Sequence, residues 1–221
     1  MIRKGLNGGS YKPLPPEAID NINETVLRVI EEIGCEVNSD TAMASLENAG
    51  ATIDKKSRRL RLSREKALKL IQQAPSEITL CGRDEKHDIH LGGTRVYTGT
   101  GGTALYIYDP HTAERRQANL DDLKAIARLV DGLDNIHLFL LPTYPNELPP
   151  EKIDVNRFFA GLDNTTKHVM GGVYTDDGMQ QVIRMAEIIA GSPENLRRRP
   201  IISIITCSIS PFIIDGGYMI W

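Results

Sequence analysis

The segment His168-Val169-Met170-Gly171-Gly172-Val173-Tyr174-Thr175 is the middle member of three apolar runs that decide the fold. The other two runs cover residues 136–144 and residues 201–207. The pattern returns after 31 and again after 33 residues, measured at Leu138, Val169 and Ile202. Short apolar runs that end in turn residues and alternate with helices are typical of buried parallel strands. The sequence therefore predicts three parallel strands in an α/β fold.

Amphipathic helix patterns follow the first two runs, and none follows the third before Trp221. Pro149-Pro150-Glu151 predicts the start of the first helix, since proline is favoured in the first helical turn. Asp176-Asp177 predicts the start of the second helix and Gly191 its end. Apolar residues at helical spacing mark the faces expected to be buried. They are Val155, Phe158, Phe159 and Leu162 in the first helix, and Met179, Val182, Ile183, Ala186, Ile189 and Ala190 in the second.

The first 119 residues predict an α+β extension rather than further βα units. Residues 1–14 are polar and rich in glycine, and Pro15-Pro16 then opens a helix that Gly34 ends. The apolar residues of this helix fall on one face: Ile19, Ile22, Val26, Val29, Ile30 and Ile33. From residue 78 to residue 109 the apolar period changes to two, which predicts antiparallel hairpins. We therefore expect two domains, residues 1–119 and residues 120–221.

Composition excludes several functional classes. The chain has 221 residues, of which 41% are apolar and 25% are charged, and its formal net charge is −3. That charge gives no general attraction to nucleic acid or to an anionic membrane. The start of the chain lacks the apolar core of a secretory signal, and the longest apolar stretch, at residues 201–209, is too short to span a bilayer. Three widely spaced cysteines form no disulfide framework, so we expect a cytoplasmic protein without a nucleic-acid or membrane partner.

The stretch Gly99-Thr100-Gly101-Gly102-Thr103-Ala104 matches the loose dinucleotide-binding pattern G-x-G-x-x-A. That function requires a helix after the glycines to hold a pyrophosphate, whereas Leu105-Tyr106-Ile107-Tyr108 has the pattern of a strand. One interpretation is a hairpin turn in which the glycines supply positive φ angles. The other is a close approach of the backbone to a ligand or to a barrel mouth, because three glycines in four positions exceed the needs of a hairpin.

Aromatic and polar residues stand at the predicted carboxyl ends of the strands: Tyr144, Tyr174, Thr175, Thr206 and Cys207. In βα barrels, binding and catalytic sites are built at those ends. Two tyrosines there suit a quaternary ammonium group, because ring faces attract a cation that cannot donate hydrogen bonds. The alternative is that both are ordinary tyrosines at the rim of the core. Cys207 fits a small buried apolar residue better than a nucleophile, since the sequence offers it no basic partner.

Neither the histidines nor the arginine cluster predicts a ligand site. His87 and His90 stand three apart in a segment with strand character, so their side chains should point to opposite faces. The other histidines, His111, His137 and His168, fit structural roles. Arg197-Arg198-Arg199 precedes the third strand, where a solvated helix end favoured by its dipole explains the cluster better than a phosphate site.

Many short segments between Gly92 and Pro211 stand in a specific order and spacing, although no single one is diagnostic. Among them are Leu91-Gly92-Gly93, residues 99–104, Tyr108-Asp109-Pro110, Glu114-Arg115-Arg116, Leu133-Asp134-Asn135-Ile136, Gly171-Gly172-Val173-Tyr174, residues 186–191 and Ser208-Ile209-Ser210-Pro211. Glu32-Ile33-Gly34 and Ala49-Gly50-Ala51 extend the pattern toward the amino terminus. In the order and spacing of these segments the chain resembles the trimethylamine methyltransferase family of corrinoid-dependent methyltransferases.

The resemblance implies a TIM (β/α)8 barrel, here truncated after about three strands and preceded by the α+β extension. It implies an enzyme that moves a methyl group from trimethylamine, or from a betaine-like quaternary amine, to the cobalt of a separate corrinoid protein. The chain would then bind no cofactor directly, would act with its cognate corrinoid protein, and would form homo-oligomers at full length. The alternative is a non-catalytic truncated remnant or interaction module of such an enzyme.

The candidate substrate-binding residues come from the strand ends and the glycine segment, and no catalytic residue or metal ligand is assigned. They are Tyr97, Gly99, Gly101, Gly102, Tyr144, Tyr174 and Cys207. A methylated ammonium is a good leaving group, so the protein has chiefly to orient it and exclude water, and no acid–base pair is required. If the substrate is a betaine, we expect the anchor for its carboxylate to lie outside these 221 residues.

Overall fold

The computed structural model describes residues 5–206 and 212–214, and within them the chain is a mixed α/β protein. Contacts between residues divide the chain into two compact units. Unit 1 consists of the described residues within 1–8 and 77–205, and unit 2 consists of those within 9–76 and 206–221.

Unit 1 is built on a parallel sheet of three strands in the order β10-β11-β12. The strands are β10 (Leu138–Leu140), β11 (His168–Gly172) and β12 (Ile202–Ile205). Their register places Leu138 opposite His168, and Val169 opposite Ile202. These are the three strands that the repeated apolar runs predict, so that prediction is confirmed.

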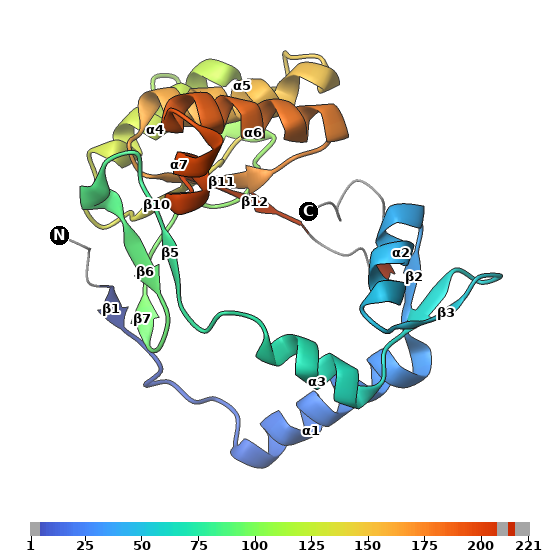
Figure 1. The fold of residues 1–221 in the computed structure, drawn as a ribbon. Coiled ribbons are helices and arrows are strands. Elements are labelled where there is room, and N and C mark those ends of the chain that lie inside the picture. Colours follow the sequence, from blue (N-terminus) through green and yellow to red (C-terminus); the bar gives the residue numbers. More distant parts are fainter. Residues whose placement is uncertain (1–4, 207–211, 215–221) are drawn as a thin grey trace. The chain divides into compact units, whose positions relative to one another are not determined.

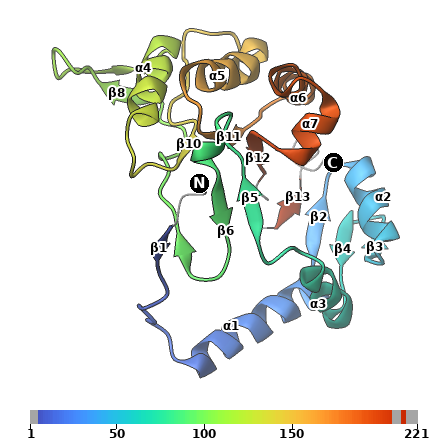
Figure 2. The ribbon, with the colours of Figure 1, turned by 60° about the vertical axis from the view of Figure 1, so that its left-hand side comes forward.

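Three long helices cover one face of this sheet (Figures 1 and 2). They are α4 (Leu120–Asp131), α5 (Pro150–Asn164) and α6 (Asp176–Ala190), and the short α7 (Pro193–Arg198) leads from α6 toward β12. α5 packs against both α4 and α6. The core between helices and sheet includes Phe139, Leu141, Phe158, Val169 and Val182. Because side chains alternate along a strand, the even-numbered residues of β10 and β11 lie on the opposite face of the sheet.

Local sequence signals set the ends of these helices. Asn119 and Asp122 form a capping box at the start of α4, with both hydrogen bonds at 2.9 Å. The hydroxyl of Thr175 caps α6 by accepting the N–H of Gly178 at 3.0 Å. Gly191 ends α6 in the left-handed conformation, with φ of 89°. The helix starts predicted for α5 and α6, and the predicted end of α6, are confirmed.

Short antiparallel pairs complete unit 1. They are β5 (Ile78–Leu80) with β6 (Ile89–Leu91), β8 (Tyr106–Tyr108) with β9 (Arg115–Gln117), and β1 (Leu6–Asn7) with β7 (Arg95–Val96). A 3-10 turn, η2 (Glu85–His87), precedes β6. The predicted hairpin of β5 and β6 is confirmed. β8 pairs with β9, which follows it in the chain, and not with a strand that precedes the glycine segment.

The glycine segment, residues 99–104, runs parallel to β10 and to the residues that follow it. Isolated bridges join Gly99 to Leu138 and Ala104 to Thr143, both in parallel orientation. The hairpin interpretation of this segment is therefore wrong. A Cβ atom added at Gly99 would lie 2.9 Å from Cγ of Leu138, so the missing side chain permits the close approach.

Unit 2 combines three helices with a four-stranded sheet in the order β13-β2-β4-β3. Its elements are α1 (Pro16–Arg28), a π-helical turn η1 (Val29–Ile33), β2 (Cys35–Val37), α2 (Asp40–Asn48), β3 (Thr52–Asp54), β4 (Arg59–Arg61), α3 (Arg64–Gln72) and β13 (Ile213–Ile214). Gly34 ends the first helical region with φ of 72°, as predicted. The apolar face of α1 is only partly covered, since Ile19 and Ile22 are each 54% exposed.

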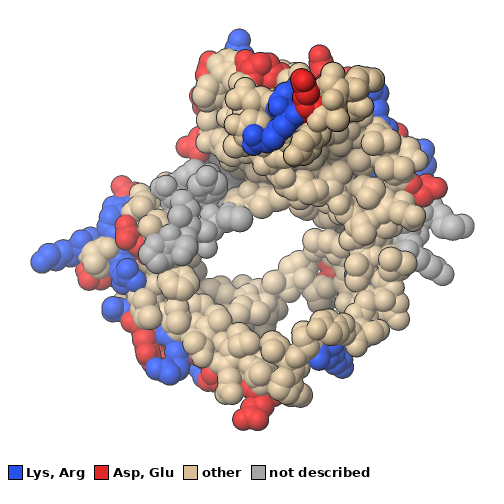
Figure 3. Space-filling model, turned by 180° about the vertical axis from the view of Figure 1, so that it is seen from behind, with Lys and Arg blue, Asp and Glu red and all other residues tan. Residues whose placement is uncertain are grey.

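The larger architecture is less complete than the resemblance implies. No sheet closes on itself within residues 5–206 and 212–214, so a closed barrel is not observed. The boundary expected between residues 119 and 120 stays a prediction, and the hairpins before it belong to unit 1 together with the parallel strands. Among the described helices, none combines the length and the apolar character needed to cross a bilayer. Acidic and basic side chains are interspersed on the face shown in Figure 3.

Candidate functional site

Tyr144 and Tyr174 lie against each other beyond the carboxyl ends of β10 and β11. Their ring centroids are 5.9 Å apart, and the rings meet edge to face at 68°. Thr143 and Val173, which precede them in the chain, are buried. Tyr174 is 46% exposed and Tyr144 is half-buried, so a ligand can reach the pair. The structure thus brings two of the predicted site residues together, and their binding role stays a prediction.

Arg157 of α5 reaches this pair from the helix layer, although its side chain is buried (1% exposed). Its guanidinium donates to the carbonyl oxygens of Thr143 at 3.2 Å and Leu141 at 3.4 Å. It also donates to Oη of Tyr174 at 3.2 Å and to Oγ1 of Thr103 at 3.0 Å. Burial lowers the pKa of the Arg157 guanidinium, but an arginine stays charged at neutral pH. One buried cation therefore ties together the glycine segment and the ends of two strands.

Asp154 stands one turn before Arg157 on α5 and is equally buried. Its carboxylate accepts the N–H groups of Tyr174 and Thr175, both at 3.0 Å, and the hydroxyl of Thr175 at 3.1 Å. Its charge also favours the charged form of Arg157. Gly178 of α6 leaves room for this carboxylate, because an added Cβ would lie 2.3 Å from Asp154 Oδ2. Two residues of α5, Asp154 and Arg157, therefore bind Tyr174, and Asp154 also binds Thr175 at the start of α6.

Neither Asp154 nor Arg157 was predicted from the sequence, because charges on a helix are ordinarily assigned to the solvated face. A signal was present in their spacing, since Asp154 and Arg157 are three apart and lie within the buried stripe. That stripe contains Ile153, Asp154, Arg157, Phe158 and Gly161. Phe159, which the apolar pattern placed inside, is 50% exposed instead.

Tyr97 and Gly99 do not join the tyrosine pair. The ring of Tyr97 packs edge-on against His137, with centroids 5.3 Å apart, and its hydroxyl donates to the His90 carbonyl oxygen at 3.2 Å. His137 immediately precedes β10, so this contact lies at the amino-terminal end of the strand. Gly99 bridges to Leu138 at the same end. These two residues therefore stand apart from the strand ends at which Tyr144 and Tyr174 meet.

Gly101 and Gly102 are exposed, and a Cβ atom added at either would meet nothing within 4 Å. They lie directly before Thr103, whose hydroxyl contacts Arg157. Cys207 lies outside the described residues, so its place at the third strand end stays a prediction.

The histidines form hydrogen bonds with protein groups. His90 Nε2 is 3.0 Å from Glu77 Oε2, and His90 Nδ1 is 2.9 Å from Thr79 Oγ1. His87 Nδ1 is 3.2 Å from Thr166 Oγ1. In the part of the chain that the structure describes, no three His, Cys, Asp or Glu residues are grouped so that they could hold a metal ion.

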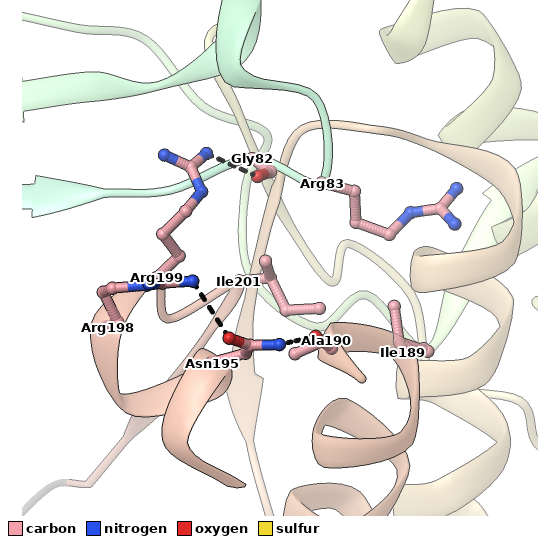
Figure 4. A pocket seen from close by; sticks show the side chains of 8 residues that line it. All are labelled: Gly82, Arg83, Ile189, Ala190, Asn195, Arg198, Arg199 and Ile201. Carbon is pink, nitrogen blue, oxygen red and sulfur yellow. Dashed lines mark hydrogen bonds between the residues drawn. The ribbon is translucent and has the colours of Figure 1, made fainter. Parts of the chain in front are cut away.

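A cavity of about 380 Å³ lies at the opposite end of the parallel sheet from the tyrosine pair, beside the start of β12. Figure 4 shows its lining: Gly82, Arg83, Ile189, Ala190, Asn195, Arg198, Arg199 and Ile201. Arg199 pairs with both carboxylate oxygens of Asp88, at 2.8 and 2.9 Å, and Arg198 donates to Asn195 at 3.0 Å. The carboxyl ends of α6 and α7 contribute to the lining, and their dipoles disfavour an anion. The arginines of this cavity are better explained as charges that stabilise the carboxyl ends of the helices than as ligands of a phosphate group.

Comparison with known proteins gives matches over nearly the whole chain. The family model described as trimethylamine methyltransferase (MTTB) matches residues 3–220. The chain is 33% identical over 214 residues to trimethylamine methyltransferase MttB of Desulfitobacterium hafniense (strain DSM 10664 / DCB-2), covering 96% of this chain and 43% of the relative. It is 24% identical over 206 residues to the glycine betaine methyltransferase of Desulfitobacterium hafniense (strain Y51), covering 93% and 42%. It is 26% identical over 214 residues to MttB of Methanosarcina thermophila, covering 93% and 44%.

The chain thus spans less than half the length of these curated relatives. The family match includes the parallel strands, the glycine segment and both tyrosines of the pair. Because the family model covers far more than half of the residues, the chain belongs to the trimethylamine methyltransferase (MTTB) family.

Proposed function

We propose that the chain forms part of a methyltransferase that moves a methyl group from trimethylamine, or from a betaine-like quaternary amine, to the cobalt of a corrinoid protein. Family membership supports the reaction class, and the names of the relatives support methylated amines as substrates. The observation that carries the proposal is the Tyr144–Tyr174 pair at the carboxyl ends of adjacent parallel strands. The proposal includes a cognate corrinoid protein as partner and a homo-oligomer at full length.

We further propose that β10, β11 and β12 belong to a TIM barrel. The three strands are parallel, and the connections between them contain α5 and α6. The sheet face away from the helices carries half-buried apolar side chains, among them Leu140, Met170 and Ile205. Apolar side chains on that face are expected of barrel strands, whose inner faces pack against one another.

The tyrosine pair suits methyl transfer from a quaternary nitrogen. Cob(I)alamin would supply the electron pair of the new cobalt–carbon bond. As the C–N bond breaks, its own electron pair stays on nitrogen, so a quaternary ammonium becomes an uncharged amine group and no protein group has to supply a proton. The site has to orient the ammonium group and exclude water. A ring face attracts such a cation by roughly 0.5–2 kcal/mol, depending on how far it is shielded from solvent.

The test measures methyl transfer to cob(I)alamin by the 221-residue chain. A panel of methylamines and betaines supplies the methyl donors, and the loss of cob(I)alamin absorbance reports the transfer. We expect transfer from at least one of them, and a rate about tenfold lower in Tyr174→Ala, since one cation–π contact is worth roughly 1.4 kcal/mol. Tyr108→Ala is the matched control, because Tyr108 is 73% exposed on β8, away from the pair.

Binding without transfer separates the two candidate functions. If methylated amines shift the resonances of Tyr144 and Tyr174 but no methyl group reaches cobalt, the non-catalytic alternative is correct for this chain. If no methylated amine binds or reacts, the tyrosine pair is not a substrate site and the proposal fails.

A further inference from the structure

Arg157 determines how two hydroxyl groups at the strand ends can form hydrogen bonds. A guanidinium has donors only, so Oη of Tyr174 and Oγ1 of Thr103 must both accept from it. Each hydroxyl therefore keeps its own hydrogen for a further acceptor. Within the described ranges, no protein acceptor takes the hydrogen of either hydroxyl.

Arg157 fixes the positions of these two hydroxyl donors. Tyr174 and Thr103 are bound by the two terminal nitrogens of one planar guanidinium, Nη1 and Nη2, whose rigid fork sets the separation of the two oxygens. Arg157 is itself held by the carbonyl oxygens of Thr143 and Leu141, and it is too deeply buried to turn toward a ligand. Tyr174 and Thr103 are exposed residues whereas Arg157 is buried, so a ligand that approaches from solvent meets Tyr174 and Thr103 before the arginine.

The charge of the arginine strengthens both donors. A hydroxyl that accepts from a cation is polarised and becomes a better donor, most of all toward an anionic acceptor. Asp154 is the acidic group nearest in the network, and it balances the charge of Arg157. Its oxygens are occupied by the N–H groups of Tyr174 and Thr175 and by the Thr175 hydroxyl. In the part of the chain that the structure describes, no hydrogen bond joins this carboxylate to either hydroxyl.

We propose that the hydroxyls of Tyr174 and Thr103, oriented by Arg157, form a subsite for a carboxylate group of the ligand. The inference rests on the proposed function, in which the ring of the same Tyr174 contacts a quaternary ammonium group. Together the ring and the two hydroxyls select a zwitterion over a plain cation. The carboxylate anchor expected outside this chain is thus assigned to two of its own residues.

The test compares two probes with the same cationic head. Glycine betaine carries a carboxylate, whereas ethyltrimethylammonium does not, and their affinities for the 221-residue chain are measured by calorimetry. We expect the chain to prefer betaine by at least tenfold. Tyr174→Phe keeps the ring and removes one donor, and Thr103→Val keeps the shape and removes the other. Each should lower the preference about tenfold, which corresponds to about 1.4 kcal/mol.

Two control variants guard against a general loss of structure. Thr103→Ser keeps the hydroxyl and should retain the betaine preference, whereas Thr103→Val should not. Tyr108→Phe removes a phenol hydroxyl elsewhere in unit 1 and should leave the preference unchanged. If Tyr174→Phe and Thr103→Val both keep the preference of the unmodified chain, the two hydroxyls do not bind the carboxylate.

Acetate, a carboxylate without an ammonium group, separates this inference from the proposed function. Its binding is followed by the NMR shifts of isotope-labelled tyrosine. If acetate binds and the Tyr174→Phe, Thr103→Val double variant does not bind it, the subsite stands even when neither ammonium probe binds. If both ammonium probes bind equally and acetate does not bind, the cation site stands and the subsite is refuted. If acetate and betaine both fail to bind, the subsite is refuted as well.

Discussion

Replacing Gly178 by alanine should loosen the site, although alanine is the better helix former. Gly178 lies in the first turn of α6, where its N–H donates to the Thr175 hydroxyl. An added methyl group would lie 2.3 Å from Asp154 Oδ2 and 2.6 Å from Thr175 Oγ1. Asp154 cannot move aside freely, because it is 1% exposed and its carboxylate is held by donors on Tyr174 and Thr175.

Three effects decide the size of the change. Helix propensity favours alanine by about 1 kcal/mol. Overpacking costs about 1–3 kcal/mol. Displacing the carboxylate of Asp154 weakens at least one hydrogen bond to a charged group, worth about 1.5–3 kcal/mol. The unfavourable effects win, so Gly178→Ala should reduce the free energy of unfolding by about 2–4 kcal/mol.

Urea unfolding followed by circular dichroism measures the total change, and amide hydrogen exchange locates it. Because the chain has two compact units, one unfolding midpoint need not describe both. Exchange at the amides of Tyr174 and Thr175 reports directly on the Asp154 contacts, and both amides should lose protection in the variant.

Gly132→Ala is the matched control. Gly132 follows α4 with φ of −81°, and an added Cβ would come no nearer than 3.6 Å to the Leu129 carbonyl oxygen. This second substitution should be neutral or stabilise by up to about 1 kcal/mol. The reasoning is refuted if Gly178→Ala is as stable as the unmodified chain and the Tyr174 amide keeps its protection.

Three further outcomes follow from single residues. Gly191→Ala should cost about 1–2 kcal/mol in urea unfolding, because φ is 89° at this helix end, and Gly191→Asn should cost less. Burial raises the pKa of the Cys81 thiol, so at pH 8 iodoacetamide should modify Cys81 only after unfolding, as mass spectrometry of its peptide would show. Burial lowers the pKa of His168 below its ordinary value of 6.5, so as pH falls the unfolded chain binds a proton before the folded chain does. Unit 1 should therefore lose stability as pH falls below 6.5. His168→Gln should flatten this pH dependence of stability between about pH 7.5 and 5.5.

The sequence predicted the parts of unit 1 that rest on continuous apolar runs. Strands β10, β11 and β12 carry apolar side chains on both faces of the sheet, so each appears as a nearly continuous apolar segment rather than an alternating one. Proline and glycine marked the ends of α5 and α6 for conformational reasons that need no tertiary contact. Because adjacent parallel strands end at the same edge of a sheet, the predicted strand ends also led us to expect a contact between Tyr144 and Tyr174.

The glycine segment shows where such a prediction stops. Gly99, Gly101 and Gly102 have no side chains, so they supply no apolar period that could mark a strand. Their backbone nevertheless runs beside β10, with bridges to Leu138 and Thr143. That pairing joins positions about 40 residues apart, and it depends on space that the sequence pattern does not reveal.

Arg157 was missed for a different reason, and that reason bears on its role. Buried carbonyl groups that no neighbouring strand pairs need other donors. At the end of β10 the carbonyl groups of Leu141 and Thr143 receive theirs from Arg157. The remaining donors of the same guanidinium then point at Tyr174 and Thr103. A residue required to complete the sheet thereby also orients the hydroxyls of the site.

For that reason Arg157 is a poor first target for mutation. Removing it would leave two buried carbonyl groups without donors, at a cost of about 1–3 kcal/mol each, and would release the two hydroxyls at the same time. A loss of ligand binding in such a variant would not separate folding from recognition. Tyr174→Phe and Thr103→Val instead act on the exposed side of the network and leave the bonds from Arg157 to the strand in place. A change in ligand preference in these variants therefore reports on recognition itself.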